Sequence, residues 1–303
     1  MFVEDILAGM VRSGTSVLFA AQGEVLAERS GVINLGTEGC MLCGALAAYA
    51  GAVATGSVFL GIVFGAGAGA VLALMFVGMV TWRGTNQLAT GLAFSFLALG
   101  VTAALGVDYV GQSAPALDSV RLPGLADIPV LGPALFDHDV LTYCGLLLGP
   151  LLWLFLYRTR WGLVLRATGE RGAVAYAYGH SPARVRCLAV TAGGALAGVG
   201  GAQLVLAYTL NWVENVTVGR GFVAVALVIF AAWNPLWASV GAYVFGGALA
   251  LQLQLQARGV DISPFLLNMA PYVITLVILV VSSRGRVRRA PDEIRAVFGT
   301  AGA

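Results

Sequence analysis

Residues 28–39 place charged and polar side chains between two apolar runs of the chain. These side chains are Glu28, Arg29, Asn34 and Glu38. A carboxylate is costly to bring into lipid, so within an apolar run it must face a partner or a water-filled cavity. Three glycines of the same stretch, which permit a bend or a close backbone approach, are Gly31, Gly36 and Gly39. We expect a polar, kinked element inside a helix bundle. It forms either a structural ion pair or cap, or part of a path for a solute, with Asn34 and Glu38 as path candidates.

A second group of residues opens an apolar stretch near position 220. Gly219, Gly221 and Phe222 begin this stretch, and Trp233-Asn234-Pro235 ends it. Glycines at the start of a helix permit a tight turn, which is one interpretation of the pair. The other interpretation is that the start of this helix borders a solute path.

A third group is the basic connection at residues 158–184, which carries five arginines against the single acidic residue Glu170. Residues 166–178 contain enough Ala, Val and Tyr for a short helix, which Gly179 would close. Ser181-Pro182 suits the start of the next helix. Such a helix could fit a groove on a partner and transmit its motion, although an ordinary connecting loop has the same composition.

Neutral polar and aromatic residues within the apolar runs are further candidates for a solute path, in particular Phe94 and Ser95. Amides and hydroxyls also hold membrane helices together, so either role is open. The sequence provides little support for an enzyme or for a metal site. Two histidines and four cysteines form no recognisable metal or catalytic pattern.

The absence of lysine limits how this chain could use ATP. All 17 basic residues are arginine. A phosphate-binding loop of the G-x-x-x-x-G-K-[ST] kind needs its lysine, so the chain cannot hydrolyse ATP by that route. Any ATP-driven work must therefore come from a partner.

Composition shows which elements must position these groups. The chain is 59% hydrophobic and 11% charged, with a mean hydropathy of +0.87, whereas soluble domains are roughly 25% charged. Uncharged runs of about 20 residues are what a membrane-spanning helix requires. We therefore predict an all-α polytopic membrane protein, with a single transmembrane domain over residues 1–303 and about 8–10 membrane-embedded helices. The expected segments are 6–23, 33–54, 57–81, 86–107, 139–157, 185–209, 219–234, 236–256 and 265–283.

Arginine bias predicts the orientation, because basic loops stay in the cytoplasm. Residues 158–184 and the tail 284–303 are therefore expected inside, and the acidic, proline-rich loop 108–138 outside. Because successive membrane segments cross in opposite directions, counting back from loop 108–138 places the N-terminus outside. If it is cytoplasmic instead, one segment must be re-entrant or split, and residues 24–39 are the natural suspect.

The string Glu28-Arg29-Ser30-Gly31-Val32-Ile33-Asn34-Leu35-Gly36-Thr37-Glu38-Gly39 resembles the signature of the simple-sugar and nucleoside branch of bacterial ABC importer permeases. Residues 219–235 and 166–179 are similar to two further segments of that family, in the same order and at the expected spacing. The resemblance covers essentially the whole chain. Within the branch, the chain is similar to the shorter of two paired nucleoside-importer permeases.

The resemblance implies a type II-importer-like fold in the bacterial inner membrane, and alternating access to a nucleoside or simple sugar. Residues 166–179 would be the segment that couples to the ATPase. Its candidate residues are Arg166, Gly169, Glu170, Ala175, Gly179 and His180. The family usually has an aliphatic residue at the last of these positions.

The family also implies several partners. They are a second permease subunit that is a different chain, an ATPase that uses ATP and Mg²⁺, an extracytoplasmic substrate-binding lipoprotein and the lipid bilayer. No cofactor on this chain and no nucleic-acid partner are expected. The alternatives are a branched-chain amino-acid permease of the same superfamily, a secondary transporter and an intramembrane enzyme.

Overall fold

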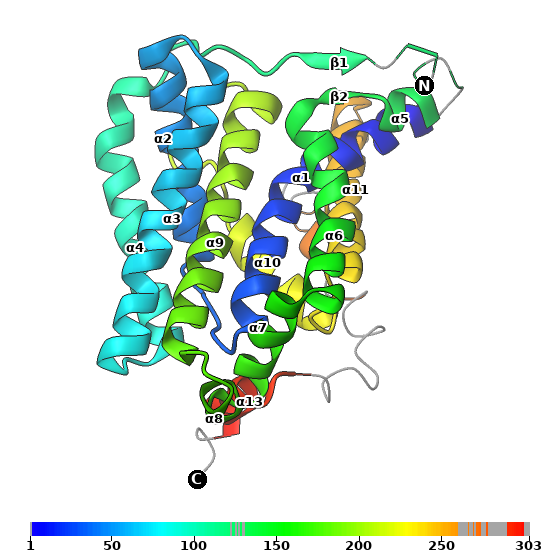
Figure 1. The fold of residues 1–303 in the computed structure, drawn as a ribbon. Coiled ribbons are helices and arrows are strands. Elements are labelled where there is room, and N and C mark those ends of the chain that lie inside the picture. Colours follow the sequence, from blue (N-terminus) through cyan, green and yellow to red (C-terminus); the bar gives the residue numbers. More distant parts are fainter. Residues whose placement is uncertain are drawn as a thin grey trace.

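The computed structural model describes residues 2–121, 131–259 and 290–299, and the single positions 123, 124, 126, 128, 266, 269, 271–273 and 277. The described chain is a helical bundle (Figure 1). Its longer helices are α1 (Phe2–Arg29), α2 (Thr37–Thr55), α3 (Val58–Arg83), α4 (Gln87–Gly106), α6 (Val140–Arg158), α9 (Pro182–Gln203) and α11 (Pro235–Ala257). The shorter ones are α5 (Leu131–Leu135), α7 (Arg160–Glu170), α8 (Gly172–Ala177), α10 (Arg220–Phe230) and α13 (Asp292–Gly299).

In the part of the chain that the structure describes, six helices are long and apolar enough to cross a membrane. They are α2, α3, α4 with its 3₁₀ extension η1 (Val107–Tyr109), α6, α9 with its π-helical extension η2 (Leu204–Tyr208), and α11. The more polar α1 has 28 residues, which is also sufficient length. Together with α10, these helices match eight of the nine expected segments, so the prediction of a polytopic all-α protein is confirmed. The ninth, residues 265–283, and the arginine cluster at 284–289 lie almost entirely outside the described residues.

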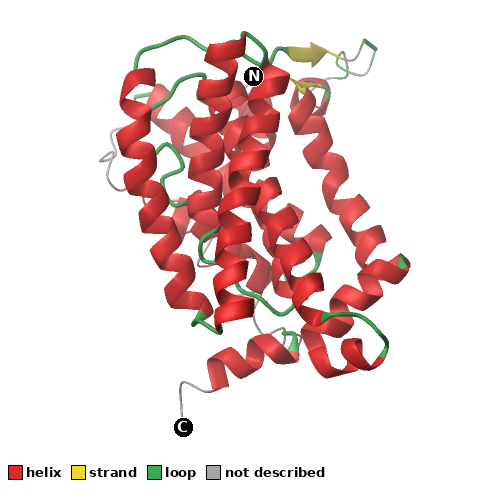
Figure 2. Cartoon of the chain, turned by 60° about the vertical axis from the view of Figure 1, so that its left-hand side comes forward, coloured by secondary structure: helices red, strands yellow, loops and turns green. Residues whose placement is uncertain are grey.

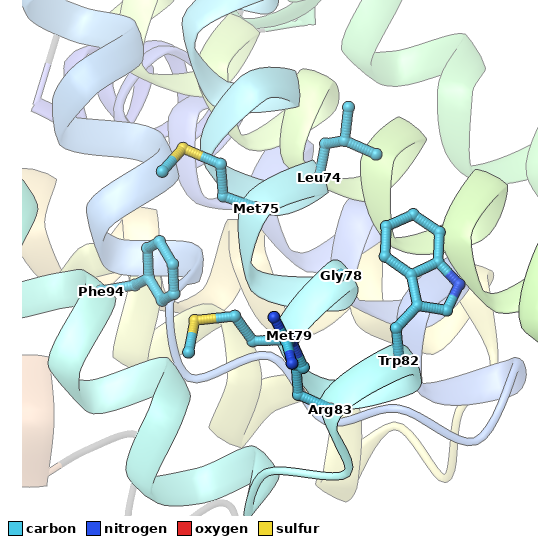
Figure 3. A pocket seen from close by; sticks show the side chains of 7 residues that line it. All are labelled: Leu74, Met75, Gly78, Met79, Trp82, Arg83 and Phe94. Atoms are coloured by element: carbon cyan, nitrogen blue, oxygen red, sulfur yellow. The ribbon is translucent and has the colours of Figure 1, made fainter.

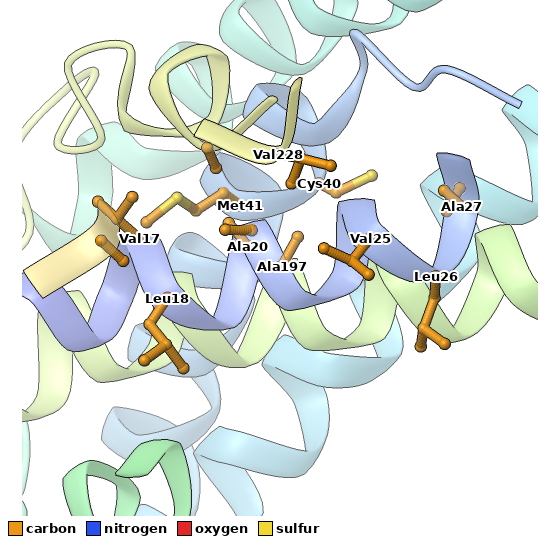
Figure 4. Packing of buried hydrophobic residues seen from close by; sticks show 14 of the residues in the cluster. Val17, Leu18, Ala20, Val25, Leu26, Ala27, Cys40, Met41, Ala197 and Val228 are labelled. Carbon is orange, nitrogen blue, oxygen red and sulfur yellow. The ribbon is translucent and has the colours of Figure 1, made fainter. Parts of the chain in front are cut away.

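Small residues bring the central helices together. Helices α1, α2, α3 and α9 form the centre of the bundle, and Val17, Leu18 and Met41 are fully buried there (Figure 4). A Cβ added at Gly198 of α9 would lie 2.2 Å from the carbonyl oxygen of Gly65 on α3. In lipid, helix association depends on such close packing rather than on burial of apolar surface from water. The glycine-rich faces of α3 and α9 are therefore the faces on which these two helices pack.

The two long connections lie at opposite ends of the bundle. The 108–138 connection includes a short antiparallel ribbon of β1 (Ser119–Arg121) and β2 (Asp137–Asp139), in which Val120 is opposite His138. The N-terminus lies at this end, whereas α7, α8 and α13 lie at the other (Figures 1 and 2). The sequence predicts that the N-terminus and loop 108–138 lie on the same side of the membrane, and in the structure both lie at the same end of the bundle.

Two local expectations differ from the structure. Residues 24–29 continue α1 as a regular helix, so they are not a re-entrant segment. The single helix expected over residues 166–178 is instead two helices, because Arg171 has extended backbone between α7 and α8 (φ −152°, ψ 106°). The expected end is confirmed, since Gly179 follows α8 with φ +83° and Pro182 lies in the first turn of α9.

Candidate functional site

Glu38 joins the start of α2 to the start of α10. Its Oε1 accepts hydrogen bonds from Thr217 Oγ1 (2.6 Å) and the backbone N–H of Gly219 (2.9 Å), and its Oε2 accepts one from the N–H of Gly221 (2.6 Å). The first N–H groups of a helix have no partner within the helix. A carboxylate satisfies them and is stabilised by the positive end of the helix dipole. We call Glu38, Thr217, Gly219 and Gly221 the α2–α10 junction.

Each glycine of the junction is needed for a different reason, Gly221 for the close contact and Gly219 for its backbone conformation. A Cβ on Gly221 would lie 2.5 Å from Glu38 Cα and 2.6 Å from Glu38 N. Gly219 has φ +78°, which non-glycine residues rarely adopt. The two glycines therefore permit both the tight turn and the close approach to α2. Phe222, the next predicted path residue, is 38% exposed.

The pass that contains α10 is half helix and half loop. With 11 residues, α10 is about 16 Å long, compared with about 30 Å for the apolar core of a bilayer. Residues 209–219 cover the remaining distance without regular structure, and Leu210, Asn215 and Val218 have positive φ. Broken backbone at membrane depth is tolerated only where protein or water satisfies its polar groups. Glu38 supplies acceptors where this loop becomes helix.

Arg220 lies beside the junction. Its Nη1 donates to Ser16 Oγ on α1 (3.0 Å), and its guanidinium carbon is 5.3 Å from the centre of the Tyr208 ring. Tyr208 belongs to the π-helical turn η2, a local irregularity common at functional sites. The junction thus connects α1, α2, α10 and the end of α9.

Residues 30–36 turn back along the end of α1 and lead into α2. Glu24 holds this turn, because its Oε1 accepts the N–H of Asn34 (2.7 Å) and its Oε2 accepts Thr37 Oγ1 (2.7 Å). The Asn34 side chain in turn accepts the N–H of Gly36 (2.9 Å). Asn34 is 2% exposed, so it acts on the turn itself in this conformation. We call residues 28–36 the signature turn.

Glu28 and Arg29 attach the signature turn to the connection between α10 and α11. Glu28 Oε2 accepts the indole N–H of Trp233. Arg29 Nε donates to the carbonyl oxygen of Trp233 (2.9 Å), and its Nη2 donates to Tyr157 Oη (2.8 Å). The predicted ion pair between Arg29 and a glutamate is not among the described contacts. Both charges instead hold the turn between two helices.

The signature turn also contacts the α7–α8 segment directly. A Cβ at Gly169 would lie 2.3 Å from the carbonyl oxygen of Arg29 and 3.1 Å from the N–H nitrogen of Gly31. Two predicted groups that are 140 residues apart in sequence, at positions 29 and 169, therefore meet backbone to backbone. A displacement of α7 must displace the signature turn, because nothing compressible lies between them.

The remaining residues predicted for coupling line the α7–α8 segment. Arg166 Nε donates to the carbonyl oxygen of Leu156 (3.0 Å), and its guanidinium lies over the Tyr157 ring. Ala175 is buried, Gly179 is exposed at the end of α8, and the His180 ring meets Trp161 edge to face. The segment exposes Trp161, Tyr176 and Tyr178 at the end of the bundle.

Phe94 and Ser95 lie on α4, away from the α2–α10 junction contacts. Ser95 Oγ donates to the carbonyl oxygen of Leu35 (2.9 Å), which fixes α4 to the signature turn. Phe94 faces Met75 and Met79 of α3 across a largely apolar cavity of about 460 Å³ (Figure 3). The cavity is lined by Leu74, Met75, Gly78, Met79, Trp82, Arg83 and Phe94.

Sequence reasoning missed Glu24, Thr37 and Thr217, and it treated Trp233 only as part of a turn. Glu24 had the same signal as Glu38, a carboxylate next to an apolar run. The other three have no such signal, because buried hydroxyls and indoles are common in membrane helices. The role of Glu38 as a helix cap depends on the distant residues 217–221, which spacing along the chain does not reveal.

The arrangement supports conformational coupling rather than chemistry. In the described part of the chain, no group of three or more His, Cys, Asp or Glu side chains is placed to hold a metal ion. The N-terminal end of a half-helix can bind an anionic solute. In α10 this end is already occupied by the carboxylate of Glu38. Glu38 at the α2–α10 junction, and Glu28 and Arg29 at the signature turn, tie helices together at points where the backbone is irregular.

Comparisons with known proteins match most of the chain. Residues 6–282 match the family model described as branched-chain amino acid transport system / permease component. A Haloferax volcanii protein named as a glucose ABC transporter permease is 38% identical over 87% of this chain and 81% of its own length. The nucleoside ABC transporter permease protein NupC of Lactococcus lactis is 32% identical over 91% of this chain and 92% of its own length. The guanosine ABC transporter permease protein NupQ of Bacillus subtilis is 29% identical over 87% of both. No solved structure matches the chain.

Proposed function

The chain belongs to the family of branched-chain amino acid transport system permease components, and from that membership we propose which solute it moves and how it is driven. It is a multi-pass permease subunit of an ATP-binding-cassette importer in the cell membrane, and a transporter component rather than an enzyme. The solute is a nucleoside or a simple sugar. The names of three relatives support this class, since one concerns glucose and two concern nucleosides.

A neutral solute also agrees with the polar groups of the interior. Glu24 and Glu38 are buried, and both oxygens of each accept hydrogen bonds from backbone N–H groups or hydroxyls of the chain itself. Glu28 is also buried, and one of its oxygens accepts the indole N–H of Trp233. A branched-chain amino acid carries both an ammonium and a carboxylate group, and the carboxylates of Glu24 and Glu38 that could pair with the ammonium already have internal partners. The branched-chain amino-acid alternative is therefore less well supported.

Transport proceeds by alternating access, with ATP and Mg²⁺ bound by a partner ATPase. The ATPase docks on the α7–α8 segment at the cytoplasmic end. A second permease subunit, which is a different chain, completes the path, and a substrate-binding lipoprotein delivers solute at the end of the bundle that holds residues 108–138. The observation that carries this mechanism is the backbone contact between Gly169 and Arg29, because it joins the docking segment to the signature turn.

The coupling assignment is tested by Gly169→Leu in the complete importer, reconstituted in proteoliposomes. The added side chain must displace Arg29, so we expect solute moved per ATP hydrolysed to fall by about tenfold or more, as overpacking of a close contact implies. Gly67→Ala is the control, because nothing lies within 4 Å of a Cβ at that position. Unchanged coupling in Gly169→Leu would reject the assignment.

The solute class is tested with the cognate binding protein and uptake competition. Unlabelled nucleosides, simple sugars and branched-chain amino acids would each compete against a labelled nucleoside or sugar. We expect competition by nucleosides or sugars and none by leucine or valine. Competition by the amino acids alone would overturn the proposed solute.

A further inference from the structure

Helix α13 packs against the end of the bundle where α7 and α8 lie (Figure 1). We propose that α13 is a strut that fixes the α7–α8 segment to the signature turn and to α10, with Glu293 as its central positioning residue. This inference rests on the coupling role proposed above for the α7–α8 segment.

A single carboxylate oxygen of Glu293 joins the starts of two helices. Glu293 Oε1 accepts the N–H of Gly172 at the start of α8 (3.1 Å) and lies 3.2 Å from Nη2 of Arg186 in the first turns of α9. Arg186 also donates from Nε to the carbonyl oxygen of Ser30 in the signature turn (3.3 Å). The side chains of Arg186 and Glu293 are 22% and 37% exposed. This polar chain therefore links α8, α9, α13 and the signature turn.

An apolar contact of α13 reaches α10. Ile294 is 1% exposed and forms a small cluster with Ile33 of the signature turn and Val225 of α10. Leu35 and Leu88 pack against the same cluster. Because Ile294 follows Glu293 directly, one turn of α13 contacts both the coupling elements and α10, the helix that begins at the α2–α10 junction.

The backbone of the signature turn lies against both α13 and α7. A Cβ at Gly31 would lie 3.0 Å from Glu293 Cβ and 3.3 Å from Gly169 Cα. At the other side, the N–H of Asp292 donates to Glu170 Oε2 (3.4 Å). The turn is thus enclosed between α7 and α13, so that a displacement of the docked segment moves the turn and α10 as one unit instead of opening a gap between them.

The test uses Glu293→Gln and Arg186→Gln, singly and together, in the complete importer in proteoliposomes. Each single change removes the charged pair. Glu293→Gln keeps the size of the side chain, whereas Arg186→Gln shortens it and also removes the hydrogen bond to Ser30. We expect solute moved per ATP to fall by about threefold to tenfold in each, as loss of a partly exposed charged hydrogen bond allows. The double variant should be no worse than Arg186→Gln alone, because Glu293→Gln removes a charge pair that Arg186→Gln has already removed. Asp292→Asn is the control, since that carboxylate pairs with Arg295 on α13 itself.

The outcomes separate this inference from the coupling role. Normal coupling in both single variants, alongside uncoupling in Gly169→Leu, would overturn the strut and leave the docking assignment standing. Multiplying losses in the double variant would also overturn it. Normal coupling in Gly169→Leu would instead reject the docking assignment itself. If Glu293→Gln lowers the amount of inserted chain, Arg186→Gln alone carries the test. Coupling by Arg186→Gln equal to wild type would then overturn the strut.

Discussion

At the scale of single residues, the buried carboxylates of this permease serve its irregular backbone. Glu38 accepts hydrogen bonds from the backbone N–H groups of Gly219 and Gly221 at the start of α10. Glu24 accepts the N–H of Asn34 in the turn that leads into α2. A buried donor without an acceptor costs about 1–3 kcal/mol, more than most single contacts contribute. These residues stabilise a conformation that the backbone would not adopt unaided.

Replacing Glu38 should therefore cost both stability and transport. Glu38→Ala leaves two backbone N–H groups and Thr217 Oγ1 without their acceptor, and we expect the free energy of unfolding to fall by about 2–4 kcal/mol. Glu38→Gln keeps one acceptor oxygen and should lose less. Unfolding in a denaturing detergent series and uptake in proteoliposomes would measure the two effects.

Glu214→Gln is the matched control for this change, because Glu214 is an exposed carboxylate in the loop before α10. It should behave as wild type in both assays. Wild-type stability and uptake in Glu38→Ala would show that the α2–α10 junction does not depend on this carboxylate.

At the scale of elements, the sequence predicted which segments are helices better than where the helices break. Apolar length identified the full-length spans because a bilayer imposes that length on each of them. The break at Arg171 and the half-helix α10 depend on contacts with other segments, the first with Glu293 and the second with Glu38. The same reason explains the candidate site. Glu38 and Gly221 were recognised as unusual, but their meeting could not be inferred from spacing.

The attachment of α1 to the α10–α11 connection yields a prediction at this scale. Trp233→Phe removes the indole N–H that Glu28 accepts and leaves a buried carboxylate oxygen without that donor. We expect the free energy of unfolding to fall by about 1–3 kcal/mol, with a matching loss of uptake.

Trp82→Phe makes the same chemical change at a position that is 68% exposed, so it should leave detergent unfolding within about 0.5 kcal/mol of wild type. Equal effects of the two substitutions would mean that the Glu28–Trp233 contact contributes nothing specific.

At the scale of the whole molecule, close contacts form a continuous route from one end of the bundle towards its middle. It begins at the α7–α8 segment, passes through Gly169 to the signature turn, and reaches the α2–α10 junction through α10 and the start of α2. Rigid, closely packed elements transmit displacement over such distances when a partner biases one of two arrangements. The chain has no lysine with which to build a nucleotide-binding loop of its own. ATP-driven work must therefore come from a partner, and on the coupling role proposed for the α7–α8 segment it enters at the end of the bundle that holds α7 and α8.

The most direct test of this account is solute uptake by the complete importer with an intact ATPase and with one whose phosphate-binding lysine is replaced. Both are compared with proteoliposomes that contain the permease subunits alone. The account predicts concentrative uptake with the intact ATPase and ATP, and none in the other two preparations. Uptake by the permease subunits alone, against a gradient, would contradict it.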